Sequence, residues 1–430
     1  MSEKMPTDDT LAYTPSQHVK KIADSFIGTP HESYATDILV NKPDFVVFTP
    51  KQNNLVTGDV YNDHFQVFDK PDGSLFAVWT QATHEGDVDQ HIAFSRSVDK
   101  GQTWSEPIVL AGSKNHTNPQ LRASWQQPMV SKSGRIYVLW NQQVTSQGPH
   151  CGNMFGIYTD NDGETWSSPK IVPMERMDRD PVDPTIPPSW CNWQRPLRLG
   201  KDGQYLVGVS RHGKAPYDAR NGGTVEFLQF DNIDDDPTVG DIALTWLSSN
   251  KKALKVEHEK FGSACEEASI VKLPDGRLFA LMRTCAGHPF WSQSANNGKT
   301  WSSPRKLLNR DGGAAYLHPR SPCPIYDWKG PEAASGTYFA LVHNTFDFDS
   351  KSEYQARGPL YLIAGTYNAD TEQPIEFAPL QLFAERPERN SFYSSLTIVD
   401  GKAVLWFPDS KFYLLGRVIG NEWFQRGGEE

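Results

Sequence analysis

The chain has 430 residues and a formal net charge of −10. Proteins that bind nucleic acids through the phosphates need clustered Lys and Arg, so this acidic balance without a basic run argues against that class of partner. No apolar run approaches the roughly 20 residues of a membrane span, and residues 1–10 are polar where a signal peptide is apolar. We therefore expect no membrane span, and the sequence leaves the localisation open.

Aromatic and turn-forming residues are abundant, with 13 Trp, 15 Tyr, 22 Phe, 33 Gly and 31 Pro. This composition is typical of many short strands joined by tight turns. We expect residues 1–34 to form an N-terminal extension and residues 35–425 to form a single domain. Residues near 35–50 are expected to help close that domain.

A unit of apolar strand, Gly turn and apolar strand recurs along the chain. It is found in residues 64–79, 125–140, 194–209 and 267–282, with looser copies in 320–344 and 393–407. Self-similarity at such a spacing is typical of propellers. Counting the strand starts predicts six blades.

A second repeat supports the same fold. The pattern Ser/Thr-x-Asp/Asn-x-Gly-x-Thr-Trp occurs at 97–104, 159–166 and 294–301, and each copy continues as Ser-x-Pro. The Asp or Asn side chain can bond the turn amides, Gly accepts a positive φ, and Trp can fill the gap between adjacent sheets. The sequence thus predicts an all-β, six-bladed β-propeller with four-stranded antiparallel blades and three Asp-box turns.

The repeat also predicts which residues meet at the mouth of the central channel. The first strands place polar or aromatic side chains at equivalent positions: His64, Trp125, Gln194, Glu267 and Tyr393. The returning strands add Asn141, Arg211, Arg283 and His343. Trp125 and Gln194 are equally consistent with contacts between blades, and Glu267 with Arg283 is also consistent with a structural ion pair. His116, His150 and His318 lie in loops without repeat support and are expected at the surface.

The five cysteines, at 151, 191, 265, 285 and 323, show no Cys-x-x-Cys spacing. Neither a disulfide framework nor a zinc site is therefore indicated. Five ordinary buried thiols are the favoured interpretation, since a free Cys behaves as a small hydrophobe. We expect no cofactor and no metal.

At these positions the sequence resembles the sialidase-like (BNR, Asp-box) superfamily over roughly residues 60–410. The resemblance implies that Tyr393, in the segment FYSSLTIVDG, is a nucleophile activated by Glu267. It also implies that Arg283 and Arg357 clamp the carboxylate of an acidic substrate, and Arg211 and Arg320 are further binding candidates. A phenol titrates near pH 10, so a neighbouring Glu is needed to take its proton.

The sequence departs from that family where the first strand should supply an Arg. The aligned segment reads Asp-His-Phe-Gln at 63–66, and a His lacks the permanent, forked charge of an Arg. The acid expected on the following loop also stays open, because residues 84–91 offer Asp87, Asp89 and Glu85. His64 and His84 more weakly resemble the pair of His residues in propeller-fold lyases that act on uronate-containing polysaccharides.

Three functions follow. The leading one is a sialidase-like glycoside hydrolase that releases a terminal acidic sugar, sialic or uronic acid, from an oligosaccharide or glycan. The alternative is a polysaccharide lyase or oligosaccharide dehydratase that uses His64, His84 or Tyr393 as acid and base on a uronate. A noncatalytic glycan-binding propeller is the third, since a fold does not fix a function.

Overall fold

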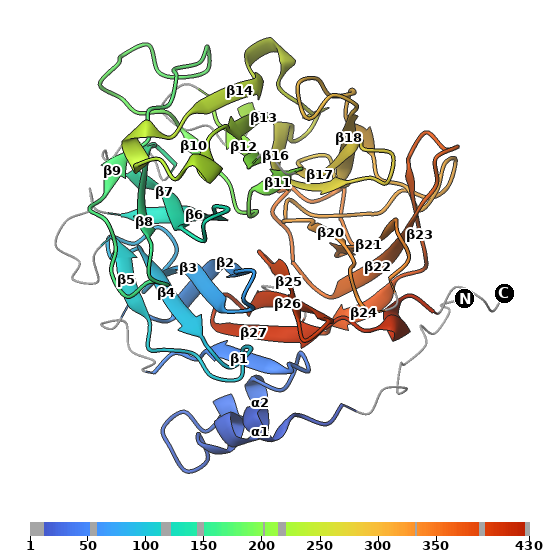
Figure 1. Ribbon diagram of the computed structural model, residues 1–430. Coiled ribbons are helices and arrows are strands. Elements are labelled where there is room, and N and C mark those ends of the chain that lie inside the picture. The colour runs from blue at the N-terminus through green and yellow to red at the C-terminus, as the bar shows by residue number, and fades with distance from the viewer. Residues whose placement is uncertain are drawn as a thin grey trace, which may run out of the picture.

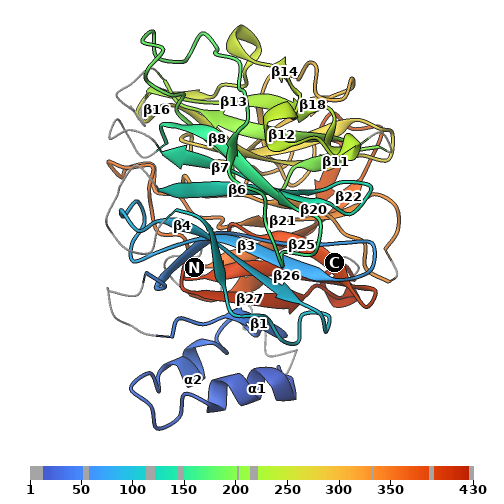
Figure 2. The ribbon, with the colours of Figure 1, turned by 60° about the vertical axis from the view of Figure 1, so that its left-hand side comes forward.

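The computed structural model describes residues 13–51, 58–112, 122–143, 150–200, 203–213, 221–331, 333–386 and 392–425. These described residues are all-β apart from two short helices near the start and a few 3-10 turns. The strands form antiparallel sheets arranged around a common centre (Figure 1). Figure 2 shows the same sheets from the side, with the helices below β1.

The first two sheets each contain four consecutive strands. One has the order β2-β3-β4-β5 and the other β6-β7-β8-β9, so each is a simple meander. Their bounds are Tyr61–Asp69, Leu75–Ala82, His91–Ser97 and Ile108–Ala111 for β2 to β5, and Ala123–Val130, Ile136–Gln143, Gly152–Thr159 and Lys170–Ile171 for β6 to β9.

The middle of the chain forms a ten-stranded sheet that consists of two antiparallel groups. The first group is β10 (Trp190–Cys191), β11 (Leu197–Leu199), β12 (Gln204–Arg211), β13 (Asn221–Phe230) and β14 (Leu244–Ser248). The second is β15 (Glu257–His258), β16 (Gly262–Lys272), β17 (Leu278–Thr284), β18 (Phe290–Ser294) and β19 (Arg305–Lys306). Among the described residues, a short parallel pairing at Asn221↔Ser263 and Gly223↔Ala264 joins them.

The last strands complete the ring and include one strand from the start of the chain. A five-stranded sheet contains β20 (Ile325–Asp327), β21 (Thr337–Val342), β22 (Leu360–Tyr367), β23 (Ile375–Phe377) and β24 (Gln381–Ala384). The final sheet has the order β1-β27-β26-β25, with bounds Phe45–Phe48, Tyr413–Val418, Lys402–Asp409 and Ser395–Val399. Because β1 pairs antiparallel with β27, residues within 35–50 close the sheet arrangement as the sequence predicts.

Apolar side chains pack between each sheet and the next. One cluster joins Trp79 of β3 to Trp406 of β26, another joins Val78 to Ile136 of β7, and further clusters follow around the ring. The cluster beside the closing sheet also takes in Val19 of α1 (Gln17–Asp24) and Tyr34 of α2 (Tyr34–Asp37). The two helices therefore belong to the same core as the sheets.

The three Trp-ended turns share one hydrogen-bond pattern. The amide N–H of the Thr donates to the Asp or Asn side chain over 2.8–2.9 Å, and the Gly N–H donates to the Ser or Thr hydroxyl over 2.8–3.1 Å. The Gly residues have φ between 83° and 84°, a region that favours glycine. Each Trp packs on an aromatic ring of the preceding sheet, at 5.8, 5.1 and 4.0 Å between ring centroids. The turns thus link neighbouring sheets at their outer side.

Candidate active site

Three inner strands carry the same backbone irregularity at the positions that the repeat predicts. His64 in β2, Trp125 in β6 and Glu267 in β16 have φ values of 51°, 55° and 51°, and the pairing register slips beside each of them. An extra residue in one strand is a β-bulge, which redirects a side chain. Holding a non-Gly residue at such a φ costs about 1–3 kcal/mol and is common at functional sites. The bulges therefore mark the centre of the ring as a candidate site.

Tyr393, Glu267 and Arg283 form a closed triangle there. The Tyr393 hydroxyl lies 3.0 and 3.3 Å from the two carboxylate oxygens of Glu267, and the Arg283 Nη1 donates to the same hydroxyl over 3.1 Å. Arg283 Nη1 also lies 2.9 Å from Glu267 Oε2. Tyr393 and Glu267 are 5% and 4% exposed, so these contacts operate with little water. The structure thus brings together the predicted nucleophile, its predicted base and one predicted Arg.

The electrostatics of this triangle favour a neutral phenol at rest. Burial and the Glu267 carboxylate raise the pKa of Tyr393 well above its ordinary value, against the opposing charge of Arg283. Burial also raises the pKa of Glu267, and the neighbouring Glu266 adds to that rise. A carboxylate with a raised pKa is a better proton acceptor. The Tyr393 proton therefore has a receiving group 3.0 Å away, while Arg283 can stabilise the phenolate that remains.

His64 stands against the ring of Tyr393, with 4.7 Å between centroids. The Thr80 hydroxyl donates to Gln126 Oε1, so its oxygen is left to accept from His64 Nδ1 at 3.4 Å. This contact places the proton of the neutral ring on Nδ1 and leaves Nε2 as the basic nitrogen. Burial lowers the pKa of His64. His64 is therefore a neutral imidazole in a position where a permanent cation would be needed for a carboxylate clamp.

The four predicted Arg residues differ in how much of their charge is already paired. Arg320 is fully buried and pairs with both Glu266 and Glu353. Arg283 pairs with Glu266 Oε2 at 2.9 Å as well as with Glu267. Burial alone would raise the pKa of Glu266, but Arg320 and Arg283 hold it well below its usual range. Glu266 is thus the charged partner that holds two guanidinium groups, one of which contacts Tyr393.

Arg357 and Arg211 lie at the two extremes of accessibility. Arg357 is partly exposed and donates from Nη2 to the backbone carbonyl of Arg320 over 3.1 Å. Arg211 is fully buried, pairs with Asp180 and lies 3.9 Å from Glu226. These contacts make Arg357 the more accessible cation, whereas Arg211 serves a buried ion-pair network.

The loop that should supply the acid makes only partial contact with the centre. His84 is exposed and Asp87 is partly buried, with its Oδ1 accepting from the N–H of Val88 over 2.6 Å. Glu85 reaches Lys411 at 2.8 Å. Its side chain is exposed, and the ion pair with Lys411 lowers its pKa. Glu85 therefore stays ionised and suits a general acid poorly.

Of the other predicted residues, Trp125 alone lies against the central rings. Its ring is 5.8 Å from His64 and stacks on His150 at 4.7 Å. Asn141 donates to the backbone carbonyls of His150 and Trp190, both at 2.9 Å, and so holds a loop in place. Gln194 lies between β10 and β11, and its side chain bonds to Ser269 and Ile270 of β16. It lines a cavity of about 870 Å³ whose lining does not include Tyr393 or Glu267.

His343 is buried, and its neighbour His318 corrects one expectation. The two rings stack at 5.0 Å, and His343 Nε2 lies 3.1 Å from Ser321 Oγ. The sequence predicts a surface position for His318, but this residue is fully buried. Its Nδ1 accepts from the backbone N–H of His343 over 3.1 Å, and its Nε2 donates to the carbonyl of Ser321. Both ring nitrogens find partners, which is why a loop His can be buried here. His116 lies outside the described residues.

Residues 73–404 match the BNR repeat-like domain family. The chain belongs to this family. It is also similar to the intramolecular trans-sialidase from Ruminococcus gnavus, with 13% identity and a TM-score of 0.59 over 88% of this chain and 97% of that chain. The NanB sialidase from Streptococcus pneumoniae is 14% identical, with a TM-score of 0.57 over 88% and 70% of the two chains (K499G mutant). The α-L-arabinanase from Penicillium chrysogenum is 16% identical, with a TM-score of 0.53 over 88% and 98%. No curated protein sequence matches significantly.

Several residues of this BNR repeat-like chain join the site although the sequence repeat does not single them out. Trp193 places its ring 5.7 Å from Tyr393, and Lys411 lies 5.8 Å from the centroid of the same ring. Lys411 pairs with the fully buried Asp63 at 2.9 Å. His150, expected at the surface, is partly exposed and stacks on Trp125. Lys411 lies in the turn between β26 and β27, where a charged residue is ordinary, so the sequence carries no signal for its inward position. None of the helices that the structure describes is long and apolar enough to cross a membrane.

Proposed function

We propose that this protein is a six-bladed, sialidase-like glycoside hydrolase that releases a terminal acidic sugar from an oligosaccharide. The observation that carries the proposal is the triangle of Tyr393, Glu267 and Arg283. A phenol that donates to a carboxylate at 3.0 Å and accepts from a guanidinium at 3.1 Å is arranged to lose its proton as it attacks. Sialidases are a known exception to glycosidases with two catalytic carboxylates, because their nucleophile is a Tyr.

In the proposed reaction the Tyr393 oxygen attacks the anomeric carbon while its proton passes to Glu267. The bond to the leaving oxygen breaks, and an acid of the 84–91 loop, for which Asp87 is the candidate, protonates that oxygen. Water then attacks the anomeric carbon and gives a proton to the Asp87 carboxylate. The bond from that carbon to the Tyr393 oxygen breaks as Glu267 returns its proton to this oxygen, and the sugar leaves with a new hydroxyl. Arg357 and Arg283 bind the substrate carboxylate, since Arg is suited to forked contacts with a carboxylate.

An elimination reaction is the alternative, and the position of His64 favours it. A neutral imidazole with a basic Nε2, 4.7 Å from the Tyr393 ring centroid, can take the C5 proton of a uronate. Tyr393 would then protonate the leaving oxygen, and the sugar would keep a C4–C5 double bond. The two reactions differ in their product, because only the unsaturated uronate absorbs in the near ultraviolet.

The test is a comparison of wild type with Tyr393→Phe on a panel of sialylated and uronate-ended oligosaccharides. We expect released monosaccharide, no gain of near-ultraviolet absorbance, and a loss of at least about a hundredfold in kcat for the variant. Tyr338→Phe is the matched control, because its hydroxyl donates to the carbonyl of Lys272 over 2.8 Å in another part of the fold. Full activity of Tyr393→Phe would refute the nucleophile, and an absorbing product would replace hydrolysis by elimination.

A further inference from the structure

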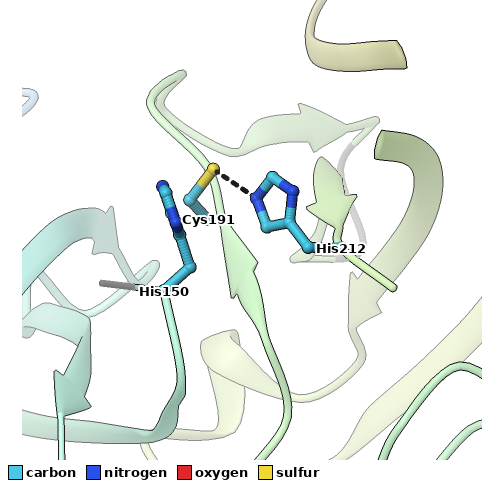
Figure 3. Close-up of side chains that lie close together, drawn as sticks. All are labelled: His150, Cys191 and His212. Carbon is cyan, nitrogen blue, oxygen red and sulfur yellow. Dashed lines mark hydrogen bonds between the residues drawn. The ribbon is translucent and has the colours of Figure 1, made fainter. Parts of the chain in front are cut away.

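Three potential metal ligands from separate segments converge beside the site. His150 immediately precedes the Cys151 bridge that leads into β8, Cys191 ends β10, and His212 follows β12. The pairing of β10 with β12 sets Cys191 opposite Ser210, and the N–H of Trp190 donates to the carbonyl of His150 over 3.0 Å. One donor atom from each residue lies within 4.8 Å of the other two. Figure 3 shows the imidazoles on either side of the thiol.

The spacing of one pair of donors suits tetrahedral coordination. Cys191 Sγ lies 3.6 Å from His212 Nε2. Zinc–sulfur and zinc–nitrogen bonds of about 2.3 and 2.0–2.1 Å, at the tetrahedral angle, separate the two ligand atoms by about 3.6 Å. The same distance fits a thiol that donates to the imidazole, so the pair alone does not decide between the two. His150 is the third donor, which a simple thiol–imidazole contact does not require.

The surroundings orient the ligands as a metal centre needs. His212 Nδ1 faces Glu266 Oε1 at 3.7 Å, and a ligating His commonly directs its other nitrogen toward a carboxylate. The ring of His150 is held by stacking on Trp125 at 4.7 Å and lies 4.6 Å from the His212 ring. Cys191 and His212 are each 3% exposed, whereas His150 is partly exposed. A fourth ligand would therefore enter from the side of His150.

We propose that His150, Cys191 and His212 bind one zinc ion, with the fourth position taken by water or by an oxygen atom of a bound ligand. Three protein ligands of nitrogen and sulfur with one open position are typical of catalytic rather than structural zinc sites. Binding displaces the thiol proton of Cys191 to solvent, so the ion and the thiolate together add one positive charge to the cluster. This proposal does not depend on hydrolysis or on Tyr393 as the nucleophile.

The electrostatics agree with a site that is neutral without metal. Burial lowers the pKa of His150 to about 4 and that of His212 well below its usual value, so both imidazoles keep a lone pair for coordination. Burial likewise raises the pKa of the Cys191 thiol, so the proton leaves only when a cation replaces it. The added charge would lie next to Glu266 and Trp125, at the edge of the candidate active site. A zinc ion there would favour anionic ligands.

The test is zinc binding by tag-free protein that has first been stripped with a chelator. Wild type should bind one zinc per chain in a competition titration and, with Co²⁺ instead, should develop the charge-transfer absorbance of a thiolate ligand. Cys191→Ser and His212→Gln should each weaken zinc binding by at least about tenfold. Cys285→Ser is the control, because Cys285 is also buried and donates to the carbonyl of Gly262, as a Ser can.

Two results would overturn the proposal. Wild type that takes up no zinc at micromolar concentration would show that Cys191 and His212 form only a hydrogen bond. Equal zinc binding by wild type and both variants would place the metal elsewhere. The cobalt spectrum of wild type decides the question even where a variant fails to fold, because a site without the thiolate gives no such band. If wild type binds no zinc but still turns over substrate, the zinc proposal fails and the hydrolase proposal stands. If Tyr393→Phe loses turnover but still binds zinc, the two sites are independent.

Discussion

Glu266 and Glu267 are adjacent in sequence, but replacing each by Gln should have opposite consequences. Glu266 is 1% exposed and neutralises Arg283 and Arg320, so Glu266→Gln leaves two buried guanidinium groups without that charge. Breaking a buried ion pair on one side costs about 3–5 kcal/mol. Glu267 has a raised pKa, which means that the fold disfavours its ionised form. Glu267→Gln should therefore change the free energy of unfolding by less than about 1 kcal/mol while it removes the base.

These energies convert to a measurable difference in thermal unfolding. At about 2.1 cal/mol/K per residue, the unfolding entropy of a chain of 430 residues is about 0.9 kcal/mol/K. Glu266→Gln should lower Tm by about 3–6 °C at pH 7, whereas Glu267→Gln should stay within about 1 °C of wild type. Calorimetry measures both, and kcat measured in parallel should fall most in Glu267→Gln. A lower Tm for Glu267→Gln than for Glu266→Gln would refute the assignment of roles.

The same pair predicts a pH dependence whose sign follows from the pKa directions. The folded-state pKa of Glu266 is depressed, so its contribution to stability is present above the pKa of the unfolded chain, about 4.3, and is lost as the pH falls below it. The Tm gap between wild type and Glu266→Gln should therefore close on acidification. Glu267 has a raised pKa, and its ionisation disfavours the fold as the pH rises above the unfolded value. The stability of Glu267→Gln should therefore rise relative to that of wild type as the pH increases.

Two further predictions compare matched positions. Gly163 and Gly73 both have φ of 84°, but a Cβ at Gly163 would come 2.6 Å from a neighbouring phenyl ring while one at Gly73 would meet nothing within 4 Å. Gly163→Ala should therefore cost more than the roughly 1 kcal/mol expected of Gly73→Ala, and equal Tm values would contradict the role of that turn between sheets. Arg357→Ala should raise KM for an acidic substrate with little change in Tm, whereas Arg211→Met should lower Tm because it leaves buried Asp180 unpaired. A lower Tm for Arg357→Ala, or a higher KM with unchanged Tm for Arg211→Met, would contradict these roles.

The repeat makes much of the architecture predictable. Each Gly turn fixes where its two strands begin and end. The number of residues before the turn is therefore enough to place His64, Trp125 and Glu267 at equivalent positions. Their shared positive φ shows that the equivalence extends to the backbone. What periodicity cannot predict is which side chains at equivalent positions meet a ligand. Gln194 occupies such a position, but its amide bonds to Ser269 and Ile270 instead.

The sequence does not predict the contacts of residues outside the repeat, for a different reason. His150, Cys191 and His212 come from three separate segments, and no short spacing of the Cys-x-x-Cys kind connects them. The pairing of β10 with β12 and the backbone hydrogen bond from Trp190 to the carbonyl of His150 bring them together. Polar loop residues such as His are often exposed, and His150 is partly exposed, but the sequence does not predict that its ring stacks on Trp125. A site made of non-local contacts leaves no pattern along the chain.

Most of the positive charges at the centre are already paired with carboxylates, so none of them replaces the Arg that is missing at position 64. Lys411 supplies a cation near that position, but Asp63 and Glu85 already pair with it. Arg283 and Arg320 are likewise matched by carboxylates, whereas among the described residues Arg357 has only a backbone carbonyl as its hydrogen-bond partner. An acidic sugar would therefore meet one unmatched guanidinium rather than a clamp of three. The first strand carries His64 where the resemblance leads us to expect an Arg. A zinc ion at His150, Cys191 and His212 would supply a positive charge near the centre instead, so a zinc-loaded protein should bind an acidic sugar more tightly than a zinc-free one.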